Sequence, residues 1–121
     1  MQNASHDCFA DCAENFVAYL FENAGFEVFS SSKWGADLAV HDRKDGSWWR
    51  IEIRSSSTGK KPRAKGSRRL KAIAEMLVEV RLKGRRKLDI TFYHLVDGNK
   101  NARIRNPSLE RLVEFMKREG E

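Results

Sequence analysis

Two acidic residues stand out because each lies in an otherwise apolar segment. Asp37 lies within GADLAV, and Glu52 lies within WWRIEIR, two positions before Arg54. Side chains alternate faces along a strand, so Glu52 and Arg54 share one face and Ile51 and Ile53 share the other. Carboxylates that meet at a strand edge beside a cation are suited to chemistry on a phosphate with a bound Mg²⁺. These acids and Arg54 are therefore the first candidates for a functional site.

Two predicted strands, joined by a tight turn, would position these acids. Apolar residues fill 36–40, and they alternate with polar ones through 48–54, which predicts a strand over each range. The polar run between them contains Asp45-Gly46, a hairpin signal because glycine tolerates the positive φ that such a turn needs. A hairpin lays the two strands side by side and so brings the two acids close together.

The first helix is predicted over residues 8–24, where apolar side chains recur at helical spacing. Gly25 supplies its ending, and residues 26–30 predict a strand. Glu14 falls at the border of the apolar arc of this helix. A carboxylate in that position is by default more often a boundary residue than a functional one.

Further elements are predicted downstream. A second amphipathic helix is marked by Leu70, Ile73, Ala74, Leu77 and Val80, with Glu79 on its polar side, and it is predicted to end at Lys83-Gly84. A fourth strand is predicted over 85–95 and a short edge strand over 102–105. The last helix is predicted to open with Asn106 as its N-cap and Pro107 at its first position. Its packing stripe comprises Leu109, Leu112, Val113 and Met116.

Length and composition predict one compact domain over residues 1–121. No run approaches the roughly 18 apolar residues of a membrane span, and the N-terminus lacks the order of a signal peptide, so we expect a cytoplasmic protein with no membrane partner. Residues 1–53 carry four Lys and Arg against nine Asp and Glu, whereas residues 54–121 carry nineteen against eight. This asymmetry favours a polyanionic partner, most often nucleic acid, over a merely soluble basic surface.

The most basic stretch is SSSTGKKPRAKGSRR, residues 55–69, which contains no acidic residue. It could be a phosphate-contacting arm that gives affinity without sequence choice, or a solvated loop without a target. The candidate nucleic-acid-binding residues are its cations, Lys60, Lys61, Arg63, Lys65, Arg68 and Arg69.

Cysteine and histidine offer weaker candidates. Cys8 and Cys12 lie four apart on the predicted first helix, with His6 upstream. A zinc site needs more ligands than these, so two reduced thiols are the favoured interpretation. His94, on a strand that is apolar on both faces, is favoured as a buried, hydrogen-bonded histidine over a catalytic one.

Three tryptophans lie near the two acids. Trp49 alternates with Ile51 and Ile53, which favours the core. Trp34 and Trp48 are candidates for stacking on unpaired bases, with hairpin packing as the alternative.

The order helix, three strands, helix, strand resembles that of the PD-(D/E)XK nuclease superfamily, and within it the small archaeal Holliday junction resolvases. The matching pieces are Glu14 in AENFVAYLFENAGFEVF, Asp37 in GAD, and Glu52 with Arg54 in IEIRSSS. The resemblance implies an α/β (α+β) fold with a restriction endonuclease-like αβββαβ core. A central mixed sheet would be flanked by helices, and a C-terminal helix would follow the core.

The resemblance also implies a metal-dependent endonuclease that hydrolyses phosphodiester bonds. Mg²⁺ or Mn²⁺ would be bound by Asp37 and Glu52 and by the carbonyl of Ile53, with Glu14 binding directly or through water. The expected substrate is nucleic acid, with DNA first and a branched or junction structure among the candidates. A homodimer, as in resolvases, is left open.

Arg54 departs from the family pattern, which has lysine there. Arginine keeps its proton above pH 12, so it could stabilise charge on the phosphate but could not act as a base. Metal-bound water could suffice, or Lys60 or Lys61 could reach in. The main alternative is a catalytically impaired nucleic-acid-binding protein or regulator that retains the fold. A third interpretation is a protein-interaction factor whose basic surface meets an acidic protein.

Overall fold

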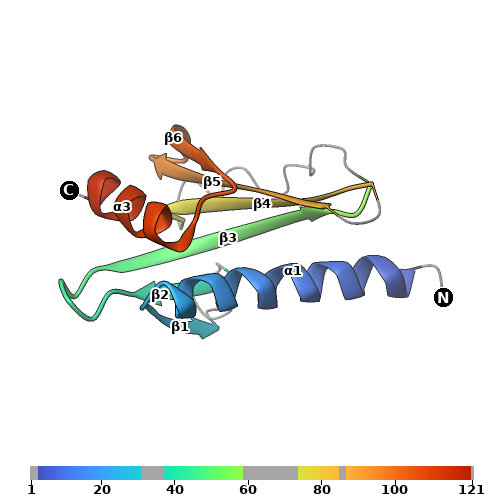
Figure 1. The fold of residues 1–121 in the computed structure, drawn as a ribbon, viewed down its shortest axis with the longest axis horizontal. Coiled ribbons are helices and arrows are strands. Elements are labelled where there is room, and N and C mark those ends of the chain that lie inside the picture. Colours follow the sequence, from blue (N-terminus) through green and yellow to red (C-terminus); the bar gives the residue numbers. More distant parts are fainter. Residues whose placement is uncertain (1–2, 31–36, 59–73, 85–86, 121) are drawn as a thin grey trace.

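The computed structural model describes residues 3–30, 37–58, 74–84 and 87–120, in which two helices and six strands are present (Figure 1). The elements in chain order are α1 (Asn3–Asn23), β1 (Glu27–Ser30), β2 (Leu38–His41), β3 (Trp48–Ser56), β4 (Met76–Lys83), β5 (Lys87–Val96), β6 (Asn99–Arg105) and α3 (Leu109–Glu119).

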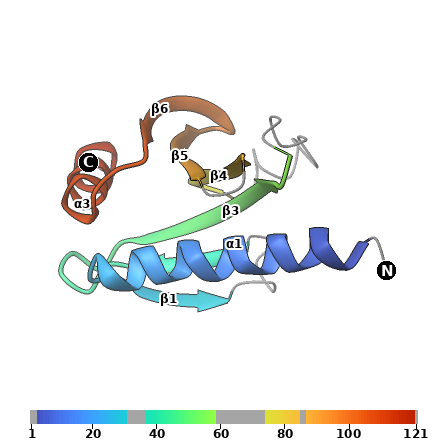
Figure 2. The same cartoon turned by 45° about the vertical axis from the view of Figure 1, so that its right-hand side comes forward.

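The six strands form one mixed sheet in the order β1-β2-β3-β4-β5-β6. All neighbouring strands are antiparallel except β3 and β4, which are parallel. The long α1 runs along β3, while β4, β5 and β6 continue the sheet beyond β3 (Figure 1 and Figure 2). The predicted α+β class with a mixed sheet is confirmed.

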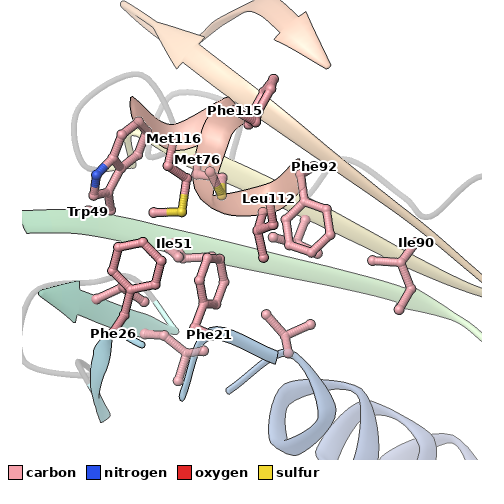
Figure 3. Close-up of a cluster of buried hydrophobic side chains, with 14 of the residues drawn as sticks. Phe21, Phe26, Trp49, Ile51, Met76, Ile90, Phe92, Leu112, Phe115 and Met116 are labelled. Atoms are coloured by element: carbon pink, nitrogen blue, oxygen red, sulfur yellow. The ribbon is translucent and has the colours of Figure 1, made fainter. Parts of the chain in front are cut away.

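Both described helices contribute to one hydrophobic core on one face of the sheet, here called the inner face (Figure 3). Phe21 of α1 lies edge-on to Phe92 of β5, with ring centroids 5.9 Å apart. Leu112 and Phe115 of α3 are buried in the same cluster, as is Ile51 of β3. Burying such side chains stabilises the fold by about 1.5 to 3 kcal/mol each.

The first half of the chain follows the sequence prediction closely. β2 and β3 form the expected hairpin, and Gly46 adopts a φ of 76° in its turn. α1 ends where Gly25 adopts a φ of 100°. Trp49 and Ile51 are buried in the core, as the alternation of β3 predicted.

The second predicted helix is wrong over residues 76–83, which form β4. Residues 70–73 of that prediction lie outside the described residues. Met76, Val78 and Val80 point into the inner core, whereas Leu77 belongs to a second buried cluster with Ala74 and Leu95. A strand buried on both faces carries a nearly continuous run of apolar residues. Such a run also contains apolar residues at helical spacing, so the sequence pattern does not distinguish a helix from a buried strand.

The predicted N-cap of the last helix is also wrong, because Ser108 caps α3. Its side chain accepts a hydrogen bond from the backbone N–H of Arg111 at 3.2 Å. Asn106 instead adopts a φ of 45° and is bound to β5. Its N–H donates to the carbonyl of Ile90, and its side-chain oxygen accepts from the N–H of Ile90, both at 2.7 Å.

The side chain of Asp89 ties this junction together. Its carboxylate accepts two hydrogen bonds from Arg105, at 3.0 and 2.6 Å, and one from Asn106 at 2.8 Å. Lys83 lies 3.3 Å away. Hydrogen bonds from Arg105 and Asn106 hold the pKa of Asp89 well below its usual range, although burial opposes this shift. The buried carboxylate thus links β4, β5, β6 and the entry to α3.

We predict that Asp89→Asn lowers the free energy of unfolding at pH 7 by about 2 kcal/mol, because hydrogen bonds to a charged group contribute about 1.5 to 3 kcal/mol. The pKa is depressed in the folded state, so this contribution is present above the unfolded pKa near 4 and is lost as the pH falls below it. Urea unfolding at pH 7 and pH 3 should therefore show a smaller difference between variant and wild type at pH 3. Glu22→Gln, on the exposed side of α1, is the control. A difference that stays constant with pH would contradict the role given to the charge.

Candidate active site

Glu14 and Asp37 come together although 22 positions separate them in the sequence. Glu14 lies in α1, and Asp37 lies immediately before β2. Burial raises the pKa of the Glu14 carboxyl, and the charge of Asp37, the charge of Asp11 and a side-chain hydrogen bond to Asp37 raise it further. Two carboxyl groups that meet in a partly buried position disfavour double ionisation, and a bound cation would relieve this.

Asp37 is also fixed to β3. Its Oδ2 atom accepts a hydrogen bond from the N–H of Ile53 at 2.7 Å, and its own N–H donates to the carbonyl of Ile51 at 3.0 Å. The Asp37 carboxyl therefore lies beside the main chain of Ile53. Three of the predicted site residues, Glu14, Asp37 and the backbone of Ile53, are brought together.

Glu52 lies on β3 between Ile51 and Ile53, whose backbone groups bond Asp37. The ladder between β2 and β3 ends at Leu38 and Ile51, so Asp37 lies outside it. Side chains alternate along a strand, so the Glu52 side chain points to the face of the sheet opposite to Ile51 and Ile53. Within residues 3–30, 37–58, 74–84 and 87–120, however, no three His, Cys, Asp or Glu side chains form a group that could hold a metal ion. The Glu52 carboxylate therefore does not join Glu14 and Asp37 as a third member.

The two carboxyls and the adjacent main chain nevertheless suit Mg²⁺. This cation takes oxygen ligands, keeps several of its waters, and is commonly bound through only one or two carboxylates together with substrate phosphates. Asp37 and Glu14 provide the carboxylates, and the carbonyl of Ile53 on β3 is a further oxygen. The donor set is thus compatible with the predicted metal.

Arg54 is half-buried on the outer face of the sheet, opposite to the inner face. In the parallel register of β3 and β4 it stands across from Glu79. Glu79 is only 2% exposed and lies 3.2 Å from Arg81. The sequence prediction missed this buried acid because it placed Glu79 on the solvent side of a helix. The alternation of Met76, Val78 and Val80 was the signal that could have revealed it.

Lys60, Lys61, Arg63, Lys65, Arg68 and Arg69 lie outside the described residues, as does Trp34. Trp48 is 48% exposed on the outer face, where it stacks on His41 with ring centroids 4.4 Å apart and lies beside Phe29.

The structure also describes the cysteine and histidine candidates Cys8, Cys12 and His94. Cys8 and Cys12 are both free and exposed on α1. His94 is largely buried, and its Nδ1 atom lies 3.3 Å from the side-chain nitrogen of Asn101 and 3.5 Å from Glu119. Its ring also packs edge-on against Trp49. These contacts fit the predicted buried, hydrogen-bonded histidine.

No family model, curated protein or solved structure matches this chain. None of the helices in the described ranges is long and apolar enough to cross a membrane.

The pair of carboxyls leads to a prediction about cation binding. Mg²⁺ or Mn²⁺ at ten times its dissociation constant should raise the free energy of unfolding of the wild type by about 1.4 kcal/mol, through mass action. Asp37→Asn should abolish this stabilisation while it keeps an oxygen for the N–H of Ile53. Thermal unfolding with and without the metal measures the effect.

The matched control is Asp45→Asn, in the turn between β2 and β3. It should respond to the metal as the wild type does. Equal stabilisation of the Asp37 variant and the wild type would exclude a metal site at this carboxyl.

Proposed function

We propose that this chain is a metal-dependent endonuclease that hydrolyses phosphodiester bonds in nucleic acid, built on a restriction endonuclease-like core. The observation that carries the proposal is the meeting of the Glu14 and Asp37 carboxyls beside the backbone of Ile53. These groups come from a helix, a strand start and the middle of a strand. Their convergence is expected if they share a cation, and packing alone gives no reason to hold two carboxyls together.

Each residue has a distinct task in this proposal. Asp37 and Glu14 would hold Mg²⁺ or Mn²⁺, with Ile53 offering its carbonyl. Glu52, which does not join these two carboxyls, would act only through water molecules that the cation keeps. The metal would polarise the phosphate and lower the pKa of the attacking water. Asp37 would keep its orientation through the hydrogen bond from Ile53. Preorganisation of this kind reduces the cost of ordering the site around the substrate.

Arg54 would supply positive charge to the phosphate as negative charge develops on it. An arginine side chain does not act as a base, so it could only stabilise that charge. Its position across from buried Glu79 favours a fixed location for this charge. The proton of the attacking water would therefore pass to a carboxylate of the site or to solvent.

A cleavage assay tests the proposal directly. Purified protein should nick plasmid, flap or four-way junction DNA in the presence of Mg²⁺ or Mn²⁺. Asp37→Ala/Glu52→Ala should reduce the rate by roughly 100-fold or more, because metal assistance contributes several kcal/mol to the transition state. Glu114→Ala, an exposed acid on α3, should leave the rate unchanged.

The proposal fails if wild type and double variant cleave equally, or if neither cleaves any of these substrates with either metal. RNA substrates of matched sequence belong in the same assay, because the site contacts described above do not choose between the sugars.

Arg54 gives a second, independent prediction. Arg54→Lys should raise the cleavage rate by roughly 10-fold or more, since a lysine can also exchange a proton and general acid–base catalysis contributes about 10²- to 10⁴-fold. Arg54→Gln should lower the rate, because the charge is removed. Single-turnover rates with saturating enzyme separate these effects from binding. If all three proteins cleave at one rate, position 54 has no part in catalysis.

A non-catalytic nucleic-acid-binding protein that retains this fold is the second candidate. It is favoured by Arg54 in place of lysine and by the separation of Glu52 from the other two carboxyls in the described part of the chain. It predicts salt-sensitive binding that is indifferent to metal and to the loss of Glu52.

A further inference from the structure

The outer face of the sheet carries charged side chains on β3 and on the strands beyond it, β4 to β6. Strand pairing aligns Arg54 of β3, Glu79 of β4, Thr91 of β5 and Arg105 of β6 in one row. A parallel row contains Glu52, Leu77, Tyr93 and Arg103. Neighbouring strands are about 4.8 Å apart, so these rows span roughly 14 Å from β3 to β6.

Acidic and basic side chains differ in solvent exposure on this face. Glu79 and Asp89 are buried, with side chains 2% and 7% exposed. The cations that contact them, by contrast, are between 27% and 59% exposed. We call the basic side chains of this region the cationic face; they are Arg81, Lys83, Lys100, Arg103 and Arg105.

The buried acids hold the cations in place without presenting negative charge to solvent. Arg105 binds Asp89 through two hydrogen bonds. Lys100 lies 3.9 Å from Glu79 and 4.3 Å from the centre of the Tyr93 ring. Each contact orients a long side chain that would otherwise sample many rotamers, so less entropy is lost when a ligand binds. The cations outnumber the acids, and the exposed surface is positive.

The positive charge of this surface indicates the kind of ligand that it could bind. A second copy of a chain with net charge +6 would be repelled. Exposed cations on adjacent strands match a polymer that repeats negative charge along its length, as the phosphate backbone does. The row that contains Arg54 crosses the outer face from β3 to Arg105 on β6.

We propose that the cationic face binds the phosphate backbone of nucleic acid and holds the strand that enters the site on β3. This inference rests on the proposed function for its ligand. It adds a backbone contact surface that is separate from the basic stretch of residues 55–69. The contacts carry no base information, so the binding is independent of sequence.

Salt-dependent binding of a fluorescent 20-base-pair DNA duplex, in EDTA to prevent cleavage, tests the inference. Lys100→Gln/Arg103→Gln should lower the magnitude of the slope of log Kobs against log [salt] by about 0.9 for each phosphate that the variant no longer neutralises. Its affinity near 0.1 M salt should fall roughly 10- to 100-fold. Arg111→Gln/Lys117→Gln, which removes the same charge from the exposed side of α3, should keep the wild-type slope and affinity.

Thermal unfolding serves as the check that both double variants are folded. Lys100→Glu/Arg103→Glu should weaken binding further than the glutamine variant does. Equal slopes in wild type and cationic-face variants overturn the inference, as does wild-type binding to polyglutamate in preference to the duplex, which would indicate an acidic protein as the ligand.

The binding and cleavage experiments test the two proposals separately. Loss of binding in the cationic-face variants, together with no metal-dependent cleavage by the wild type, supports the cationic face and rejects the endonuclease. Metal-dependent cleavage by a wild type whose variants retain their salt slope rejects the cationic face and leaves the endonuclease standing.

Discussion

The hydrogen bond from the N–H of Ile53 to the carboxyl of Asp37 connects the candidate site to the sheet. Asp37 lies just before β2, where the chain has not yet joined the regular ladder. Without this bond its side chain would have no fixed direction. With it, the carboxyl is held beside β3 and faces Glu14 of α1. The site therefore depends on the register of β2 against β3 and on the packing of α1 against the same strands.

That register is set by the hydrophobic core. Ile51 and Trp49 are buried beneath α1 and α3, and a shift of one residue would expose them and bury Glu52 and Arg54. The free energy of such a shift is large compared with that of any single polar contact in the site. Core packing thus fixes the positions of the functional candidates, although none of the core residues takes part in the proposed chemistry.

The two faces of the sheet differ in composition. The inner face is apolar and is covered by the described helices. The outer face combines a small apolar cluster with buried acids and exposed cations. Glu79 pairs with Arg81 of its own strand and Lys100 of β6, and Asp89 pairs with Lys83 of β4 and Arg105 of β6. The residues that make these ion pairs therefore also form most of the proposed binding surface.

Sequence patterns predicted most of the first half of the chain because its signals are local. The hairpin needs only Asp45-Gly46 between two alternating segments, and α1 needs only its apolar period and Gly25. The predictions failed at β4 and at the start of α3, for different reasons. β4 is buried on both faces, so its apolar spacing fits a helix as well as a strand. Asn106 has the right chemistry for an N-cap, but its bonds to Ile90 of β5, distant in sequence, hold it in another conformation.

The sequence by itself determined which residues could carry chemistry, because their types and their places on strand or helix faces follow from local periodicity. It identified Glu14, Asp37 and Glu52, and it assigned Trp49 to the core. Only the tertiary structure decided which of them meet. Glu14 and Asp37 converge through the packing of α1, whereas the Glu52 carboxylate does not form a three-residue group with them among the described residues. The burial of Glu79 and Asp89 also depends on strand neighbours that lie far apart in the chain, and only the tertiary structure shows which cations contact them.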